Sequence, residues 1–393
     1  MSKRWGIRSF FVHEKIAFST LLWYNKKKLK LQQGENEMGI YLNPENVDFQ
    51  EVLNSKIYVD KSELIQYTNS VLRTTQKYIC VSRPRRFGKS MAANMLTAYY
   101  SRGCDSRGLF QGLKIATHPD FEKYLNQYNV IHLNMRDYLT ESENMKQLIQ
   151  FVEDDLLDEL QQEFSDLRMP RRKTLVKVLE QAFAQYKIPF VFIIDEWDCI
   201  FRVHKSDAAS QKDYLDFLRN LLKDKSYIAL AYMTGILPIK KYGEHSAINV
   251  FYEYSMTDAS PIEEFTGFTE QEVRQLCEQY NMPFSETKKW YDGYCVDGVS
   301  IYNPKSVVEA MLRGKFSNYW TQTETYEALK IYIQSNEFGV QDVILKLLAG
   351  EKEKIDTTTF SNDMVTFATK DDVLTLLVHL GYLTYNAETK EIW

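Results

Sequence analysis

The chain has 393 residues, of which 44% are hydrophobic, and a formal net charge of −5. This length and apolar content support a large core and predict two or three domains. The slightly acidic balance gives no general affinity for nucleic acid, so only a local basic patch would support such a partner. Because the sequence has no run of about 18 apolar residues, we expect no transmembrane helix and no membrane partner.

The five cysteines are irregularly spaced and include no C-x-x-C pair. An odd number in this arrangement predicts neither a zinc site nor a disulfide framework. Reduced thiols in a cytoplasmic protein are therefore the interpretation that fits best.

Residues 1–37 differ in character from the rest of the chain. The apolar segment Phe10-Phe11-Val12 is broken at once by charged residues, which a signal peptide does not allow. Gln33-Gly34-Glu35 can be encoded by CAA-GGA-GAA, which contains a bacterial ribosome-binding sequence shortly before the Met38 codon. We therefore expect a native start at Met38, and an ordinary amphipathic extension is the alternative.

The sequence predicts that a strand, a tight loop and a helix follow one another between residues 78 and 103. The apolar run 78–81 precedes Ser82-Arg83-Pro84-Arg85-Arg86-Phe87-Gly88-Lys89-Ser90, and a helical pattern begins at Met91 and is expected to stop near Gly103. Gly-Lys-Ser in this context is typical of a phosphate-binding loop, in which lysine contacts the β- and γ-phosphates and serine binds Mg²⁺. The pattern G-x-x-x-x-G-K-[ST] is broken at its first glycine, where this chain has Arg83.

Other segments up to residue 260 alternate between strand and helix patterns. Strands are expected at 129–133, 190–194 and 227–233, and helices at 142–167, from 172 to 186 and around 214–222. The run at 190–194 has five consecutive apolar residues, as a strand buried on both faces does. The alternation predicts an α/β fold, a parallel sheet flanked by helices, over residues 38–260.

Polar side chains follow the apolar strands at their carboxyl ends, where ligands bind in such sheets. The end of one strand carries Asp195 and Glu196, and the end of the next carries Thr234. We expect Asp195 to hold Mg²⁺ beside Ser90, and Glu196 to orient and deprotonate an attacking water. Thr234 would hydrogen-bond near the γ-phosphate, so Glu196, Lys89 and Thr234 are the candidate catalytic residues.

The pattern after residue 260 predicts a mostly helical region that ends in a winged-helix-like unit. Thr269 and Glu272 form a capping box, Asn303-Pro304 opens another helix that Gly314 closes, and helices are expected at 325–335 and 339–349. A last helix opens at Thr369 and ends at Gly381, before a hairpin formed by 382–385 and 391–393. Because the chain stops in the second hairpin strand, we expect this region to be truncated.

The sequence resembles the AAA-ATPase-like proteins, P-loop ATPases common in Bacteroidetes and Clostridia, from Met38 almost to Trp393. The motifs that carry the resemblance are Ile57-Tyr58-Val59-Asp60-Lys61, Arg83-Pro84-Arg85-Arg86-Phe87-Gly88-Lys89-Ser90, Asp195-Glu196-Trp197-Asp198, Thr234-Gly235-Ile236, Phe265-Thr266-Gly267-Phe268-Thr269, Trp290-Tyr291-Asp292-Gly293-Tyr294 and Ile301-Tyr302-Asn303-Pro304.

The resemblance implies a P-loop NTPase fold of the ASCE or RecA-like kind and the cofactors ATP and Mg²⁺. It also implies that Arg83 is a normal residue of this loop and that the whole loop, from Arg83 to Ser90, binds the nucleotide. Members of the family usually continue into a PD-(D/E)xK nuclease-like domain. Glu351-Lys352-Glu353-Lys354 lies in a polar linker without a preceding core strand, so no nuclease activity is assigned to these residues.

The leading functional hypothesis is an ATPase module that acts as a switch, with the nucleotide and either a second copy or another protein as partners. A non-hydrolysing nucleotide-binding scaffold is the first alternative, because no arginine supplied by another subunit is identifiable. DNA interaction through the winged-helix-like region is a second, although residues 261–393 contain no dense basic helix. A small-molecule kinase is less favoured because Asp195-Glu196 suits water activation.

Overall fold

The computed structural model describes residues 39–205, 207–239, 248–296, 298–319, 337–358, 360, 367 and 369–393. The interpretation of residues 1–37 and of Met38 as the start therefore lies outside the described residues, as does the helix expected at 325–335.

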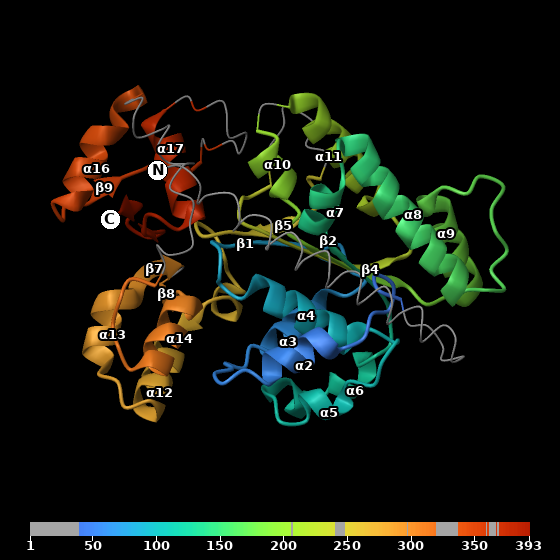
Figure 1. Cartoon of the computed structure of the whole chain (residues 1–393), viewed down its shortest axis with the longest axis horizontal. Helices are drawn as coiled ribbons and strands as arrows, with labels where there is room; N and C mark the ends of the chain where they lie inside the picture. The colour runs from blue at the N-terminus through green and yellow to red at the C-terminus, as the bar shows by residue number, and fades with distance from the viewer. Residues whose placement is uncertain are drawn as a thin grey trace, which may run out of the picture.

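A parallel sheet of five strands lies at the centre of the molecule, in the order β2-β3-β4-β1-β5 (Figure 1). The strands are β1 (Tyr78–Ser82), β2 (Asn129–Asn134), β3 (Phe190–Asp195), β4 (Ile228–Gly235) and β5 (Tyr252–Tyr254). In β3, Phe192 packs in the core on one face of the sheet, and Val191 and Ile193 pack in the core on the other. All three side chains are fully buried, which confirms the prediction of a strand covered on both faces.

Helices cover both faces of this sheet, as predicted for an α/β fold (Figure 1). One face is covered by α2 (Val47–Leu53), α3 (Glu63–Val71), α4 (Lys89–Tyr100), α5 (Arg107–Phe110) and α6 (Phe121–Tyr124), with the short 3-10 helix η1 (Lys114–Thr117) beside them. The other is covered by α7 (Met135–Glu141), α8 (Met145–Glu163), α9 (Leu175–Tyr186), α10 (Cys199–Val203) and α11 (Ala208–Leu222).

Helix α4 ends earlier than predicted. Its last residue is Tyr100, and Ser101 is already extended, with φ −61° and ψ 122°. Gly103 has a different role, because a Cβ atom at this position would lie 2.2 Å from the carbonyl oxygen of Asn43. The glycine therefore permits a close approach of two backbone segments.

The region after residue 260 contains a second sheet, in the order β6-β8-β7-β10-β11-β9, together with helices. Its elements are the 3-10 helices η2 (Glu263–Phe265) and η3 (Glu337–Gly339), the strands β6 (Phe268–Thr269), β7 (Asp292–Val296), β8 (Val299–Tyr302), β9 (Glu353–Lys354), β10 (Tyr385–Asn386) and β11 (Glu391–Ile392), and the helices α12 (Glu270–Gln279), α13 (Phe284–Tyr291), α14 (Pro304–Arg313), α16 (Val340–Leu348) and α17 (Lys370–Leu380).

Helix termini in this region follow the sequence closely. The capping boxes of Thr269 with Glu272 and of Thr369 with Asp372 both form. Asn303 caps α14, and Gly314 ends it with φ +58°. The predicted hairpin is present but shorter, since Tyr385 pairs with Ile392.

The hairpin of β7 and β8 was not expected from the sequence. These strands pair antiparallel, with Val296 opposite Val299. Their residues do not form an apolar run, because β7 begins Asp292-Gly293. The dipeptide Asp297-Gly298 in the sequence is a strong hairpin signal, and it could have revealed the pair.

The two sheets lie on either side of the predicted domain boundary at residue 260. The last strand of the first sheet ends at Tyr254, and the first strand of the second begins at Phe268. Within the described ranges, no helix is both long and apolar enough to cross a bilayer.

His379 on α17 is a buried histidine close to the loop that follows β1. Its Nδ1 atom has no hydrogen-bond partner among the described residues. Burial, and secondarily the positive charge of Arg83, lower the pKa of His379 to about 3. The folded chain therefore holds this imidazole neutral at pH values where an unfolded chain protonates it.

We predict that His379 contributes to acid sensitivity. Below pH 6.5, the approximate pKa of histidine in an unfolded chain, the unfolded state binds a proton at His379 and the folded state does not. The free energy of unfolding therefore falls by about 1.4 kcal/mol per pH unit as the pH drops toward 3. The variant His379→Gln should lose this component. Urea titrations at pH 7.0 and pH 5.0 measure it, and an unchanged difference between the two pH values in His379→Gln would contradict the prediction.

Candidate functional site

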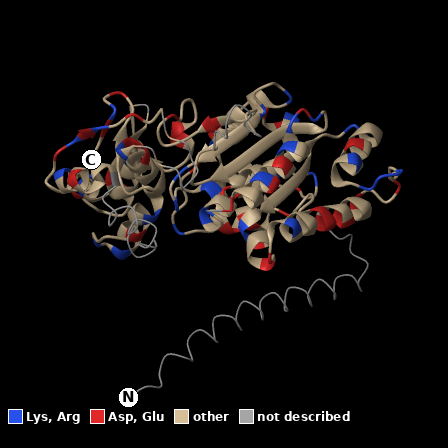
Figure 2. Cartoon of the chain, turned by 90° about the horizontal axis from the view of Figure 1, so that it is seen from above, with Lys and Arg blue, Asp and Glu red and all other residues tan. Residues whose placement is uncertain are grey.

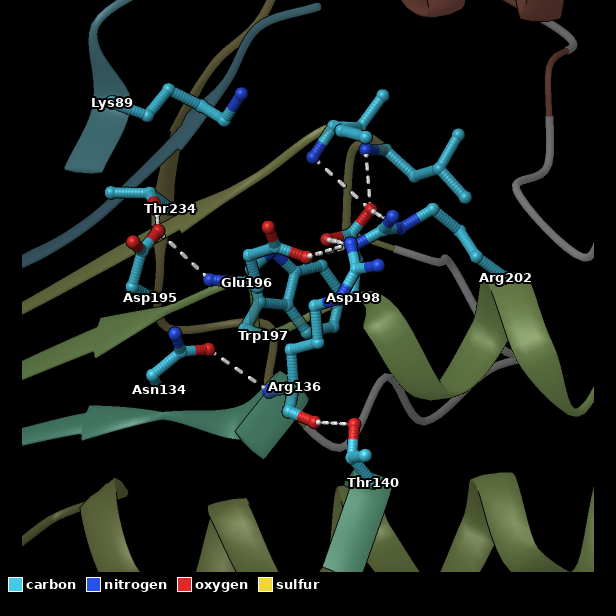
Figure 3. A network of polar contacts seen from close by, with 12 residues as sticks. Lys89, Asn134, Arg136, Thr140, Asp195, Glu196, Trp197, Asp198, Arg202 and Thr234 are labelled. Atoms are coloured by element: carbon cyan, nitrogen blue, oxygen red, sulfur yellow. Dashed lines mark hydrogen bonds and ion pairs between the residues drawn. The ribbon is translucent and has the colours of Figure 1, made fainter. Parts of the chain in front are cut away.

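The carboxyl ends of three neighbouring strands bring the predicted site residues to one edge of the sheet. Val81 of β1 lies opposite Thr234 of β4, and Ile194 of β3 lies opposite Met233. The loop that follows β1 and the acidic pair that follows β3 are therefore separated by β4 alone. Figure 3 shows Lys89, Thr234, Asp195 and Glu196 together in this region.

Lys89, the first residue of α4, is buried beneath the loop. Its Nζ atom donates hydrogen bonds to the carbonyl oxygens of Arg83 (3.0 Å) and Pro84 (2.9 Å). Burial lowers the pKa of Lys89 to about 8, although the charges of nearby carboxylates, Asp195 first, oppose this effect. The loop itself turns through left-handed conformations at Arg86 (φ +68°) and Gly88 (φ +87°), the second of which favours glycine.

A cavity of about 900 Å³ opens beside this loop. Residues 85–91 of the loop and α4 form one wall, and Arg136, Glu196 and Asp198 lie on another. The remaining wall is largely apolar and comes from residues 57–59 and from Val308 and Leu312 of α14. Ile57, Tyr58 and Val59 form no strand and line this apolar part.

The Arg83 side chain points into the protein. It is 1% exposed, and its Nη1 atom donates to the carbonyl oxygens of Ser82 and Tyr254, both at 3.0 Å. The lining residues in the described chain include Arg85, Arg86, Phe87, Gly88, Lys89 and Ser90, but neither Arg83 nor Pro84. Arg85 and Arg86 therefore face the cavity, whereas Arg83 and Pro84 do not line it.

Asp195 and Thr234 meet behind the cavity wall. The Thr234 hydroxyl donates a hydrogen bond to Oδ1 of Asp195, and the backbone N–H of Glu196 donates to the same oxygen at 2.9 Å. Both side chains are buried. These contacts fix the Asp195 carboxylate at the end of β3 and place the backbone of Glu196 next to it.

Glu196 reaches the cavity from a left-handed backbone conformation, with φ +51°. Its Oε2 atom lies 2.8 Å from the guanidinium of Arg202 and 3.7 Å from that of Arg136. Burial raises the pKa of Glu196, but the hydrogen bond and charge of Arg202, with the charges of Arg136 and Lys89, outweigh it and bring the pKa below its usual range. Glu196 is therefore an ionised carboxylate at neutral pH.

Asp198 anchors this acidic corner. It is fully buried, and its Oδ2 atom accepts hydrogen bonds from the backbone N–H groups of Ile236 (3.1 Å) and Leu237 (2.9 Å). The same carboxylate lies 3.1 Å from Nε of Arg202. Figure 3 shows the two side chains in contact. A chain of contacts thus runs from the end of β4 through Asp198 and Arg202 to Glu196.

Arg136 and Arg202 were not identified from the sequence. Arg202 lies four residues after Asp198, the spacing of an ion pair on a helix, and that spacing was a usable signal. Arg136 follows the carboxyl end of β2, so the rule that ligands bind beyond strand ends also applied to it.

The region after residue 260 packs directly against the loop. Phe87 is buried in the hydrophobic core of that region, and its ring lies 5.3 Å from that of Tyr294. The backbone N–H of Gly267 donates to the Phe87 carbonyl at 2.9 Å. Gly381, at the end of α17, has φ +85°, and a Cβ atom there would lie 2.9 Å from Cβ of Pro84.

Comparison with known families gives one family-level match. The model of a family described as Predicted AAA-ATPase matches residues 47–243, about half of the chain. A curated relative, an uncharacterized protein in the vnfD 5′ region of Azotobacter chroococcum mcd 1, is 25% identical over 256 residues. That alignment covers 62% of this chain and 47% of the relative, so the chain spans about half the length of the curated relative that it matches.

Solved structures similar to this chain include the Aeropyrum pernix ORC2 protein in ADPNP and ADP complexes, with 11% identity, a TM-score of 0.32 and coverage of 86% of this chain and 91% of that one. AMPPCP-bound DnaA from Aquifex aeolicus has 8% identity, a TM-score of 0.26 and coverage of 76% and 69%. Cdc6p from Pyrobaculum aerophilum has 11% identity, a TM-score of 0.26 and coverage of 84% and 88%. These low scores carry no conclusion about what this chain binds.

We predict that Gly381→Ala destabilises the protein more than Gly314→Ala does. Both glycines end helices with positive φ, so both alanines incur a left-handed backbone cost of about 1–2 kcal/mol. Only at Gly381 does the new methyl group also displace the loop at Pro84, since nothing lies within 4 Å of the corresponding position at Gly314. Urea denaturation of both variants measures the difference. An equal decrease in the free energy of unfolding in the two variants would show that the end of α17 is not tightly packed against the loop.

Proposed function

The chain belongs to the family described as Predicted AAA-ATPase, and from this premise we propose that it binds ATP with Mg²⁺ and hydrolyses it as a regulatory module. One observation supports this proposal above all: Lys89, Ser90 and Glu196 line the same cavity, at the carboxyl edge of a parallel sheet. Ligands of α/β sheets bind at this edge.

The cavity suits a nucleoside triphosphate in its size and because it has both a basic wall and an apolar wall. Its volume of about 900 Å³ lies within the range of small-molecule sites. Arg85, Arg86 and Lys89 offer positive charge for the phosphates, and the N-terminus of α4 offers backbone N–H groups. The apolar wall of Ile57, Tyr58, Val308 and Leu312 would take the adenine ring.

Ser90 and Asp195 are the proposed Mg²⁺ residues. Ser90 presents an exposed hydroxyl at the cavity, and Asp195 is a buried carboxylate fixed by Thr234 and the Glu196 backbone. Hydroxyl and carboxylate oxygens are the donors that Mg²⁺ prefers. When bound, the ion would neutralise charge on the β- and γ-phosphates.

Glu196 is the proposed water-orienting residue. Its carboxylate is ionised and lines the cavity, so it can accept a hydrogen bond from the attacking water. The water oxygen forms a bond to the γ-phosphorus, the bond from that phosphorus to the β–γ bridging oxygen breaks, and the water proton passes to Glu196. ADP leaves with the electron pair of the broken bond. Thr234 acts through Asp195, whose carboxylate its hydroxyl holds.

A switch role fits the contacts between the loop and the region after residue 260. Phe87 belongs to the hydrophobic core of that region. A change of loop conformation on nucleotide binding would therefore alter the packing of this core. We propose that this region transmits the nucleotide state to a second copy of the chain or to a protein partner in the cytoplasm. Figure 2 shows Lys and Arg interspersed with Asp and Glu in its view, so charge gives no support to a nucleic-acid partner.

We predict that Glu196→Gln keeps ATP binding and lowers turnover by about 100-fold or more, because the amide cannot accept the water proton. Calorimetric titration with ATP and Mg²⁺ measures binding, and phosphate release measures turnover. Wild-type turnover in this variant would refute the role of Glu196. Tight binding with no turnover in the wild type would instead identify a non-hydrolysing scaffold.

We predict that Lys89→Ala weakens ATP binding by at least about 100-fold, because charge-assisted hydrogen bonds to the phosphates are lost in a buried site. Lys305→Ala is the matched control, since Lys305 also lines the cavity but is an exposed lysine that pairs with Glu309. Calorimetric titration of both variants measures the effect. Similar affinity in wild type and Lys89→Ala would contradict the phosphate-loop assignment.

A further inference from the structure

Two arginines approach the Glu196 carboxylate, and the structure holds them very differently. Arg202 lies on α10, and Arg136 lies in the first turn of α7. Both interact with the same oxygen, Oε2 of Glu196, at 2.8 Å and 3.7 Å. Because the two side chains differ in burial and in partners, we expect them to have different roles.

Arg202 is committed to its protein partners. Its side chain is only 12% exposed and bridges Glu196 to the fully buried Asp198. Moving this guanidinium toward a ligand would leave Asp198 as a buried carboxylate without its counter-ion, which is costly. Arg202 therefore stays where it is when the cavity is filled.

Arg136 has no such commitment. Its side chain is 57% exposed, and its ion pair with Glu196 is a long one at 3.7 Å. Exposed ion pairs of this kind contribute little to stability, so the guanidinium can exchange Glu196 for a stronger anion at little cost. Its backbone, in contrast, is fixed, because the Asn134 side chain accepts from the Arg136 N–H at 3.1 Å and the Arg136 carbonyl accepts from Thr140 at 2.9 Å.

The direction of approach matters as much as the freedom of the side chain. Arg136 lines the cavity beside Glu196, the proposed site of the attacking water, whereas Arg85 and Arg86 line it from the phosphate loop. In a nucleotide placed with its γ-phosphate beside Glu196, a guanidinium on this side would face the γ-phosphate oxygens, where negative charge must be stabilised as the phosphoryl group transfers. The figure of the site shows Arg136 extending from α7 toward Glu196 and Arg202 (Figure 3).

We propose that Arg136 contacts the γ-phosphate of ATP and acts as a catalytic arginine supplied by the same chain. The proposal rests on the proposed ATPase function and deepens it. On nucleotide binding, Arg136 moves from Glu196 to the phosphate, and Arg202 continues to hold Glu196 in place. Hydrolysis then needs no arginine from a second subunit, so turnover per molecule is independent of protein concentration.

The test is steady-state ATP hydrolysis and ATP binding by the full chain. Arg136→Ala should lower kcat by about 1,000-fold, the usual worth of such an arginine, with the Kd for ATP changed by no more than about threefold. Arg136→Lys should keep part of the rate, since it retains charge without the planar fork. Arg107→Ala is the matched control, because Arg107 is 53% exposed and pairs with Glu122 outside the cavity. A melting temperature for each variant verifies folding.

Three further measurements separate the outcomes. Wild-type turnover per molecule should stay constant over a 100-fold range of protein concentration. Turnover that Lys89→Ala abolishes but Arg136→Ala leaves intact would overturn the role of Arg136 while the ATPase proposal stands. Recovery of activity on mixing Arg136→Ala with Glu196→Gln chains would place the arginine in trans and also overturn it. No turnover in the wild type would overturn both proposals together.

Discussion

The site depends on the hydrogen bonds that the buried guanidinium of Arg83 makes to backbone carbonyls. Arginine carries five donors and cannot lose its charge, so a buried arginine must be met by acceptors. Here two backbone carbonyls receive it, one from Ser82 and one from Tyr254 of the edge strand β5. The side chain thus connects the start of the loop after β1 to the edge of the sheet. A glycine at this position, as in the common loop pattern, would leave those carbonyls without this donor.

The loop that Arg83 begins also lies against the C-terminal helix α17. Arg83 helps to keep the buried His379 neutral, and Gly381 at the end of that helix leaves just enough room for Pro84. Lys89 closes the loop from inside through the carbonyls of Arg83 and Pro84. The loop after β1 is therefore packed between the central sheet and the C-terminal region, and both contribute to its conformation.

The acidic side of the site is organised by a second buried ion, Asp198. Two backbone N–H groups after β4 and the Arg202 guanidinium satisfy its carboxylate. Because Arg202 also holds Glu196, the left-handed backbone at Glu196 is stabilised by a side-chain contact rather than by glycine. Gly235 makes room for this arrangement, since a Cβ atom there would lie 2.7 Å from the Trp197 ring nitrogen.

Local patterns in the sequence determined the elements that bear the site. Three kinds of pattern act over a few residues, so each could be recognised without knowledge of the fold. They are the apolar run before Asp195, the Gly88-Lys89-Ser90 motif where α4 begins, and the caps at Thr269, Asn303 and Thr369. The alternation of strands and helices was also sufficient to predict the parallel sheet, and with it the meeting of the loop with Glu196 and Thr234 at one edge.

Tertiary structure alone decided the direction of side chains and the partners of charges. Arg83, Arg86 and Arg136 are the same residue type, yet one is buried against β5, one is exposed on the loop and one lies beside Glu196. Composition and spacing do not distinguish them, because burial of a long cation depends on acceptors that come from distant segments. The docking of Phe87 in the C-terminal core was hidden for the same reason, since it depends on contacts between segments far apart in the sequence.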